Sequence, residues 1–198
     1  MSEKYAEHDA YSDPTTGVLK NLLNIKEQSL LEKVESEFSS YQAFQLYINP
    51  LKDAPFDSNS LCSIHYRLFK DVYEWAGKYR TVDISKGGNR FSHVHYIQSS
   101  LDALFQQLQE ENGLQGLDAS LFSQRSAFYM AELNAIHPFR EGNGRTQREF
   151  LNQLAYRNNM MIEWTKIPAK DILKATIESY SGNTRLLIQL IENNLTLQ

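Results

Sequence analysis

Two helices joined by a polar loop decide the fold, and their sequence reads 119-ASLFSQRSAFYMAELNAI-136, 137-HPFREGNGRTQR-148 and 149-EFLNQLAYRN-158. In the first part, large apolar side chains recur at helical spacing on several sides, which predicts a central, buried helix. Asp118 is its candidate N-cap, and Pro138 ends it. A second helix is expected from Arg145 to about Asn158.

The same spacing predicts further helices on both sides of this pair. One is expected to bury a single apolar stripe and to end at Asn49-Pro50; the stripe consists of Leu31, Val34, Phe38, Tyr41, Phe44 and Ile48. Another runs from a cap at Asp57 or Ser58 to Gly77. Others are expected at about 97–108, 165–177 and 183–191. These patterns predict one all-α domain over 1–198, with a loop segment at 1–17.

Residues 82–94, VDISKGGNRFSHV, carry a different signal. Short alternating runs around Ile84 and Phe91 flank the turn residues Gly87-Gly88-Asn89. Glycine and asparagine between such runs are typical of a β-hairpin. We expect this segment to be the one hairpin of the domain.

Composition limits the kinds of partner. The chain has 20 basic and 24 acidic residues, a net charge of 20 − 24 = −4, which argues against unselective binding to nucleic acid or anionic membranes. No run approaches the about 18 apolar residues of a membrane span, and the acidic N-terminus does not resemble a secretory signal. A single cysteine, Cys62, excludes an intrachain disulfide. We expect a protein that acts inside the cell.

The loop at 137–148 carries the groups that an anion site needs. A helix N-terminus presents unpaired N–H groups, and Gly142 and Gly144 would let the backbone around Asn143 adopt positive φ and wrap a phosphate. Arg145 and Arg148 lie three residues apart and would share one helix face. Two arginines there oppose the helix dipole, an arrangement that makes sense when an anion is bound.

Glu141 and His137 complete the set. Glu141 is a carboxylate that could hold Mg²⁺ together with phosphate oxygens, and the His137 imidazole could accept a proton from a hydroxyl. Taken singly, each feature has an ordinary alternative: a helix-capping histidine, a tight turn, or solvated arginines. Their combination in twelve consecutive residues, 137–148, favours a nucleotide site.

This stretch resembles the Fic family signature His-x-Phe-x-Asp/Glu-Gly-Asn-Gly-Arg-x-x-Arg at every defining position. The segments RLFKDVYEWAGKYR, VDISKGGNRF and IESYSGN also resemble Fic domains, especially bacterial Fic toxins. The resemblance implies a Fic fold of about seven to eight helices, with a β-hairpin flap beside the active site. It also implies transfer of AMP from Mg-ATP to a hydroxyl of a target protein.

Site roles follow from the resemblance position by position. His137 would be the general base, Phe139 would anchor the loop in the core, and Glu141 would hold Mg²⁺ at the α- and β-phosphates. The segment 179–183 is a candidate for adenine contacts.

The remaining signature residues would hold the phosphates. Gly142, Asn143 and Gly144 would form an anion hole. Arg145 would contact the β-phosphate region and Arg148 the γ-phosphate.

By the same resemblance, the flap would bind an extended segment of the target through main-chain hydrogen bonds. The residues expected to contribute are Ile84, Lys86, Gly87, Gly88 and Phe91, with Ile84 and Phe91 clamping the modified side chain. The alternative is a solvent-exposed hairpin with Phe91 in the core.

Two rival activities stay open. The related Doc kinases carry Lys where this chain has Gly144 and transfer a γ-phosphate, so Gly144 favours AMP transfer. A nucleotide-binding module without turnover is the other rival, and the intact His137 argues against it.

Fic domains are commonly silenced by a helix with Ser/Thr-x-x-x-Glu-Gly/Asn, and no Ser or Thr of this chain is followed by Glu four residues later. The resemblance therefore implies the toxin of a toxin-antitoxin pair, whose small antitoxin supplies a glutamate to Arg148. Similar toxins modify topoisomerase ATPase subunits, which the acidic N-terminus fits modestly better than the small GTPases modified by secreted Fic proteins. A bacterial cytoplasmic enzyme is expected, with delivery into another cell left open.

Overall fold

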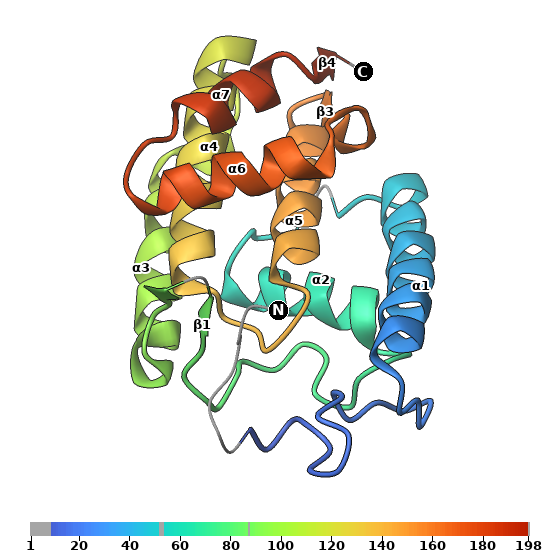
Figure 1. The fold of residues 1–198 in the computed structure, drawn as a ribbon. Coiled ribbons are helices and arrows are strands. Elements are labelled where there is room, and N and C mark those ends of the chain that lie inside the picture. The colour runs from blue at the N-terminus through green and yellow to red at the C-terminus, as the bar shows by residue number, and fades with distance from the viewer. Residues whose placement is uncertain (1–8, 52–53, 87, 198) are drawn as a thin grey trace.

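The computed structural model describes residues 9–51, 54–86 and 88–197, and Figure 1 shows their arrangement. In this part of the chain there are seven α-helices: α1 (Gln28–Ile48), α2 (Ser58–Phe69), α3 (Ile97–Glu110), α4 (Ala119–Ile136), α5 (Asn143–Arg157), α6 (Ala169–Tyr180) and α7 (Arg185–Glu192). Short 3₁₀ turns precede α3 and α6 and follow α3, at Val94–Tyr96, Trp164–Lys166 and Asn112–Leu114. The all-α prediction is confirmed.

Helices α4 and α5 form the centre of the domain, as the sequence predicts. Phe122, Tyr129 and Leu133 of α4 are fully buried, and Asp118 caps the helix by accepting a hydrogen bond from the Leu121 N–H at 2.8 Å. Helix α4 packs against α3, α5, α6 and α7, while α2 packs against α1 and α5 (Figure 1). The loop between α4 and α5 therefore connects the two central helices of the domain.

The buried face of α1 differs from the prediction. Leu31, Glu35, Ser39 and Leu46 are buried, whereas the expected stripe is largely exposed. Exposed apolar side chains on this helix include Phe38, Tyr41, Phe44 and Ile48. The prediction is wrong because α1 turns a polar pair, Glu35 and Ser39, toward an arginine on α5, and spacing alone cannot reveal such a partner.

Helix α2 ends earlier than predicted. Asp57 caps it, accepting from the Ser60 N–H at 2.8 Å, but the helix stops at Phe69 and turns continue to Gly77. Val72 lies in these turns and is still fully buried. Apolar spacing of three or four therefore persists in turns that are not helical, and this misled the prediction.

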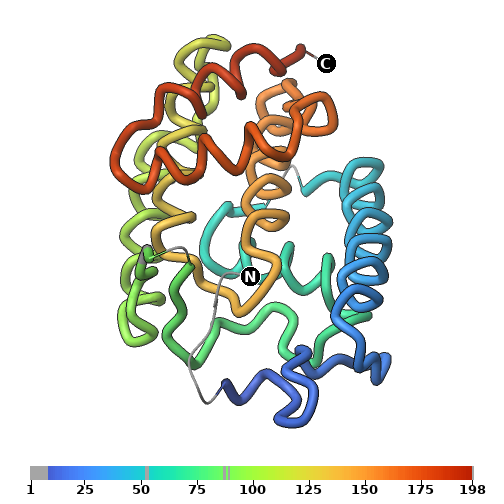
Figure 2. Tube along the Cα trace, viewed as in Figure 1, coloured from blue at the N-terminus to red at the C-terminus, as the bar shows by residue number. Residues whose placement is uncertain are grey.

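Two small antiparallel sheets complete the described structure. In the first, β1 (Ser85–Lys86) pairs with β2 (Asn89–Arg90), so the predicted hairpin forms with strands shorter than 82–94. In the second, β3 (Met160–Ile162) pairs with β4 (Leu195–Leu197), which the sequence analysis did not predict. Figure 2 shows the loop before α1 running below the helices, at the end opposite β3 and β4. None of the described helices is long and apolar enough to span a membrane.

Candidate active site

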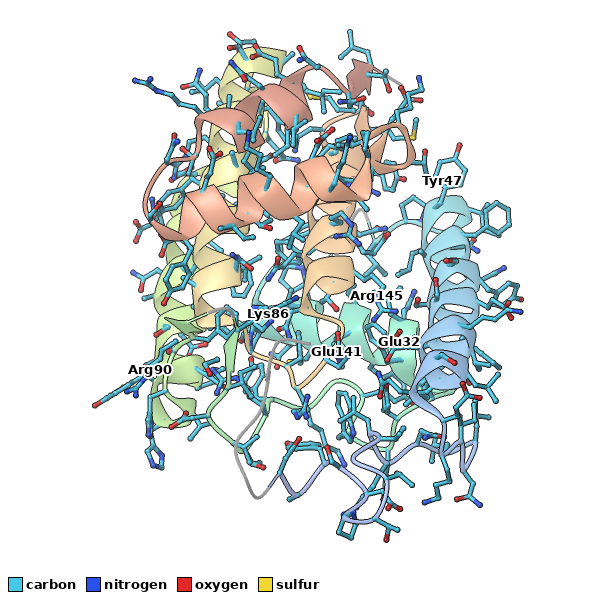
Figure 3. All side chains as sticks on the ribbon, viewed as in Figure 1. Glu32, Tyr47, Lys86, Arg90, Glu141 and Arg145 are labelled. Carbon is cyan, nitrogen blue, oxygen red and sulfur yellow. The ribbon has the colours of Figure 1, made fainter. Side chains whose placement is uncertain are left out.

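A cavity of about 750 Å³ opens beside the N-terminus of α5. Every residue of the predicted site from 137 to 148 that was assigned to base, metal or phosphate lines it: His137, Glu141, Gly142, Asn143, Gly144, Arg145 and Arg148. The flap contributes Lys86 and Phe91, and Figure 3 shows Lys86, Glu141 and Arg145 around the foot of α5. The structure therefore brings these predicted residues together around one cavity.

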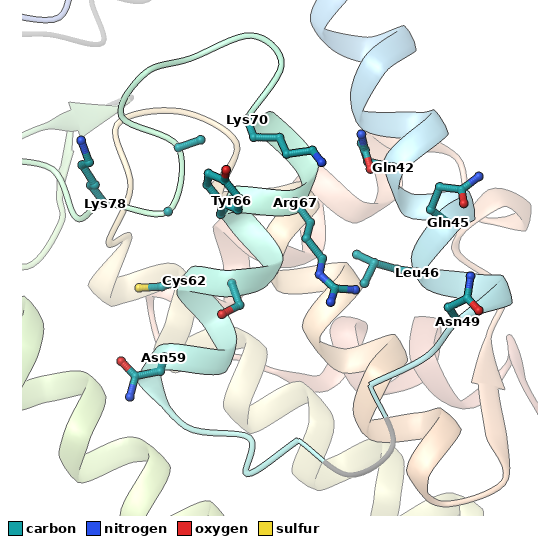
Figure 4. Close-up of a pocket in the computed structure, with 13 residues that line it drawn as sticks. Gln42, Gln45, Leu46, Asn49, Asn59, Cys62, Tyr66, Arg67, Lys70 and Lys78 are labelled. Carbon is teal, nitrogen blue, oxygen red and sulfur yellow. The ribbon is translucent and has the colours of Figure 1, made fainter.

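Another cavity, of about 830 Å³, lies between α1 and α2 (Figure 4). Its side chains include Arg67 and Lys70, which are exposed, and several carboxamides, but no residue of the 137–148 segment. Volume does not distinguish the two cavities. Among the described residues, a histidine, a carboxylate and two arginines line the cavity beside α5, which makes it the candidate active site.

His137 ends α4 in an unusual conformation. It caps the helix with φ 51° and ψ 62°, a left-handed geometry that is strained for a residue with a side chain. Its Nδ1 lies 3.2 Å from the Asn134 carbonyl oxygen, so Nδ1–H donates and Nε2 is the nitrogen that can accept a proton. The Phe91 ring stacks on the imidazole with centroids 3.8 Å apart. This arrangement suits a general base.

His65 supports the loop from behind and was missed by the sequence analysis. It is fully buried, accepts a hydrogen bond from the Gly77 N–H at 2.8 Å, and donates from Nε2 to the Glu141 carbonyl oxygen at 3.0 Å. Its ring stacks on Phe139 with centroids 3.8 Å apart. Burial lowers the pKa of His65 to about 3, so this imidazole is neutral and structural.

The Asn143 side chain holds the loop closed. Its side-chain amide donates to the Phe139 carbonyl oxygen at 2.7 Å, and its Oδ1 accepts from the Phe139 N–H at 2.9 Å. The side-chain amide therefore bonds to both polar groups of the Phe139 backbone and stabilises the loop. The backbone N–H groups at the start of α5 remain the anion donors, since the first amides of a helix have no intrahelical partner.

Only one of the two glycines has positive φ. Gly142 precedes α5 with φ 81°, and a Cβ there would lie 2.4 Å from ring carbons of Phe69. Gly144 lies within the helix, where a Cβ would come 3.3 Å from Arg148 Nη1. The prediction of two positive-φ glycines is therefore wrong for Gly144, whose small size instead leaves space beside an arginine.

Arg145 is partly neutralised by its own chain. Its guanidinium donates to the buried Glu35 carboxylate and, at 3.2 Å, to Ser39 Oγ, and it lies 3.9 Å from the Glu141 carboxylate. Tyr73 also donates to Glu35. Arg145 thus lines the cavity and also bonds to Glu35 and Ser39 of α1. The sequence analysis did not identify these partners.

Arg148 contrasts with it. Its side chain lines the cavity, and within the described ranges no residue forms a hydrogen bond or ion pair with it. Burial and the nearby charge of Arg145 lower the pKa of Arg148 to about 10, so it remains a cation at neutral pH. A half-buried guanidinium without a carboxylate partner is chemically suited to bind an anion.

The five residues predicted to form the flap's binding surface do not all face the cavity. Phe91 and Lys86 line the cavity, and Gly88 turns the hairpin with φ 84°. Gly87 lies outside the described residues. Ile84 is buried, 5% exposed, and so does not face a target in this conformation as the clamp prediction requires. The opposite wall comes from residues 164–180, where Tyr180 is the one member of the predicted 179–183 adenine segment that lines the cavity.

Comparisons with known proteins identify a family. The Fic/DOC family matches residues 55–155. The chain is 48% identical over 196 residues to the protein adenylyltransferase VbhT of Bartonella schoenbuchensis, covering 99% of this chain but 41% of that protein, so it spans less than half of the relative's length. It is 38% identical over 169 residues to the probable protein adenylyltransferase Fic of Escherichia coli, covering 84% and 82% of the two chains.

Solved structures show the same architecture. The N-terminal Fic domain of a Bep effector from Bartonella quintana, solved with bound ADP, superposes with a TM-score of 0.87 at 29% identity over 95% of each chain. BepC from Bartonella tribocorum, solved with bound AMPPNP, gives 0.85 at 27% identity over 95% of this chain and 97% of that one. Together with the family match and the complete signature at 137–148, these likenesses show that the chain belongs to the Fic/DOC family.

Proposed function

We propose that this chain transfers AMP from ATP to a hydroxyl side chain of a protein. One observation carries the proposal: a base, His137, and a cation without a carboxylate partner in the described structure, Arg148, line the same cavity. The relatives named protein adenylyltransferases support this activity, as do the neighbours solved with ADP and AMPPNP.

The charges of the cavity favour a triphosphate. Arg148 would take the γ-phosphate and Arg145 the β-phosphate region, beside the first backbone amides of α5. Within the part of the chain that the structure describes, Glu141 is the only acidic residue that lines the cavity. One carboxylate fits Mg²⁺, which usually takes one or two together with phosphate oxygens. Bound there, the ion would neutralise charge on the α- and β-phosphates.

The reaction then needs only positioning and one proton acceptor. His137 Nε2 accepts the proton of the attacking hydroxyl, whose oxygen forms a bond to the α-phosphorus. The bond from the α-phosphorus to the bridging oxygen of the β-phosphate breaks, and pyrophosphate leaves. Arg148 and Arg145 stabilise the charge of that leaving group. Gly144 keeps space beside Arg148 that a longer side chain would fill.

Labelled nucleotides test the proposal. The full chain is incubated with Mg²⁺, bacterial lysate and ATP labelled at either the α- or the γ-phosphorus. Label from the α-position on a protein band is expected. Label from the γ-position alone would indicate a Doc-like kinase. Nucleotide binding with no transfer from either position, in lysates from several sources, would leave a binding module.

We further propose that the chain is the toxin of a toxin-antitoxin pair and that its inhibitor inserts a glutamate against Arg148. The missing Ser/Thr-x-x-x-Glu-Gly/Asn sequence supports this, together with the lack of a carboxylate partner for Arg148 in the described structure. A partner protein that blocks labelling should fail to do so after its glutamate is replaced by Gln. Growth of cells that express the active chain alone and contain its target would contradict a toxin.

The target is proposed by class only. A topoisomerase ATPase subunit in the bacterial cytoplasm is the first candidate, and a small GTPase reached by delivery into another cell is the second. Purified members of both classes, offered in the labelling reaction at equal concentration, distinguish them. Labelling of neither would contradict both assignments.

A further inference from the structure

The C-terminal end of α4 is fully bonded, and its bonds involve the flap. The last carbonyl groups of a helix lack intrahelical partners and must find other donors. Here the His137 N–H donates to the Leu133 carbonyl oxygen at 2.9 Å, and His137 Nδ1–H donates to the Asn134 carbonyl oxygen at 3.2 Å. The Ser92 N–H, from the flap, donates to the Ala135 carbonyl oxygen at 3.1 Å.

Arg80 supplies the remaining donors at this end of the helix. Its Nε donates to the His137 carbonyl oxygen at 2.9 Å, and its Nη2 donates to the Ile136 carbonyl oxygen at 3.3 Å. Its backbone N–H donates to Pro138 at 2.9 Å. The side chain is buried, the residue being 2% exposed, and a cation at a helix C-terminus also opposes the negative end of the dipole.

The same guanidinium holds both stems of the flap. Nη1 donates to the Val82 carbonyl oxygen at 2.9 Å, Nη2 donates to that of Ser92, and Asp83 lies 3.6 Å from Nη1. One planar guanidinium thus joins two carbonyls at the C-terminal end of α4 to one carbonyl on each side of the flap, a geometry that a lysine ammonium cannot reproduce. Next to this guanidinium, Phe91 stacks on His137.

We propose that Arg80 is a positioning residue that fixes the flap against His137, so that a hydroxyl held on the flap meets Nε2 at one place. The inference rests on the proposed function, since it concerns the placement of the protein substrate. Arg80 does not line the cavity and acts through the backbone at Val82, Ser92 and His137. A shift of about 1 Å in such a geometry costs on the order of 100-fold in rate.

Matched substitutions test the proposal. Arg80→Lys and Arg80→Gln are compared with Arg67→Lys and Arg67→Gln, since Arg67 is exposed on α2 and contributes nothing to the site. The readouts are kcat and KM for AMP transfer, nucleotide Kd, and hydrogen exchange across the chain. For Arg80→Lys, we expect kcat to fall about 10–100-fold. The KM for ATP and the nucleotide Kd should change by less than about threefold, because the phosphate site is intact. Exchange should accelerate at 82–92 but not within α5.

Two results would overturn the inference: wild-type kcat in folded Arg80→Gln, or parallel losses of kcat, nucleotide affinity and exchange protection throughout the chain. The latter would indicate a merely structural role. Where both variants fail to fold, wild-type exchange decides. Slow exchange of the Phe91 and Ser92 amides, comparable to α4, supports the coupling, and fast exchange overturns it. Absence of AMP transfer by the wild type would overturn the proposed function alone, because nucleotide Kd and exchange still measure the coupling.

Discussion

The two sides of the 137–148 segment differ in how their polar groups are satisfied. On the side facing the core, the Asn143 amide closes on the Phe139 backbone, and His65 bonds to the Glu141 carbonyl oxygen. On the side facing the cavity, His137 presents Nε2, and Arg148 has no carboxylate partner among the described residues. Internal bonds hold the core side of the segment in place, so Arg148 on the cavity side can be left without a carboxylate among the described residues.

Arg145 lies between these two sides. It borders the cavity, yet the buried Glu35 of α1 binds its guanidinium. The two arginines of the signature therefore differ: Arg145 is part of the internal network, and Arg148 is open to an anion. Substitutions on each side should separate activity from stability.

The largest expected effect comes from the side of the 137–148 segment that faces the cavity. His137→Ala removes the proton acceptor, so kcat for AMP transfer should fall about 10²–10⁴-fold, the usual contribution of a general base. Nucleotide Kd should stay within about threefold, because the phosphates are held elsewhere. Rate measurements with α-labelled ATP, together with calorimetric binding, check this. Transfer at an undiminished rate would show that another group accepts the proton.

A change on the core side should reduce stability instead. Gly142→Ala places a Cβ 2.4 Å from the Phe69 ring at φ 81°, so both overpacking and backbone strain oppose it. The free energy of unfolding should fall by about 3 kcal/mol, measured by urea denaturation. Gly182→Ala is a matched control, since Gly182 also has positive φ, 88°, but no atom within 4 Å of the added Cβ. Equal losses in the two variants would assign the whole effect to φ.

The two arginines should give opposite patterns. Arg148→Gln is expected to weaken nucleotide binding about 10-fold, or about 1.4 kcal/mol, while the melting temperature stays the same or rises, because an unpaired, partly buried charge is removed. Arg145→Gln leaves Glu35 buried without its cation, so the melting temperature should fall with a smaller loss of affinity. Calorimetry and thermal unfolding on both variants measure this. Identical profiles would remove the distinction between the two arginines.

The smallest effect concerns Glu149 on the core side of α5. Burial raises the pKa of this carboxyl to about 7, although Gln153 donates to it at 2.6 Å. Between pH about 4.5 and about 7, Glu149 keeps its proton in the folded state but loses it in the unfolded state. The free energy of unfolding therefore falls as pH rises through this range. Glu149→Gln should flatten this slope, so the free energy of unfolding should rise relative to the wild type more at pH 8 than at pH 5. Urea denaturation at both pH values tests it, and parallel slopes would contradict the shift.

The sequence predicts contacts that are local or contained in the signature. The caps Asp118 and Asp57 are confirmed, and the predicted site residues between His137 and Arg148 line one cavity, because caps and turns depend on neighbours in the chain. Glu35, His65 and Arg80 were missed, since their partners lie 110, 76 and 57 positions away and no spacing rule connects them. The error on α1 has the same origin.

The pairing of Met160–Ile162 with Leu195–Leu197 has a practical consequence. A recombinant version that ends before Asn194 would lack β4, so β3, which follows α5, would have no strand to pair with. The Glu163 N–H would also lose its acceptor, the Asn194 carbonyl oxygen at 2.8 Å. An uncovered strand edge invites pairing between molecules. Shortened proteins made for crystallisation should therefore retain the residues up to Leu197.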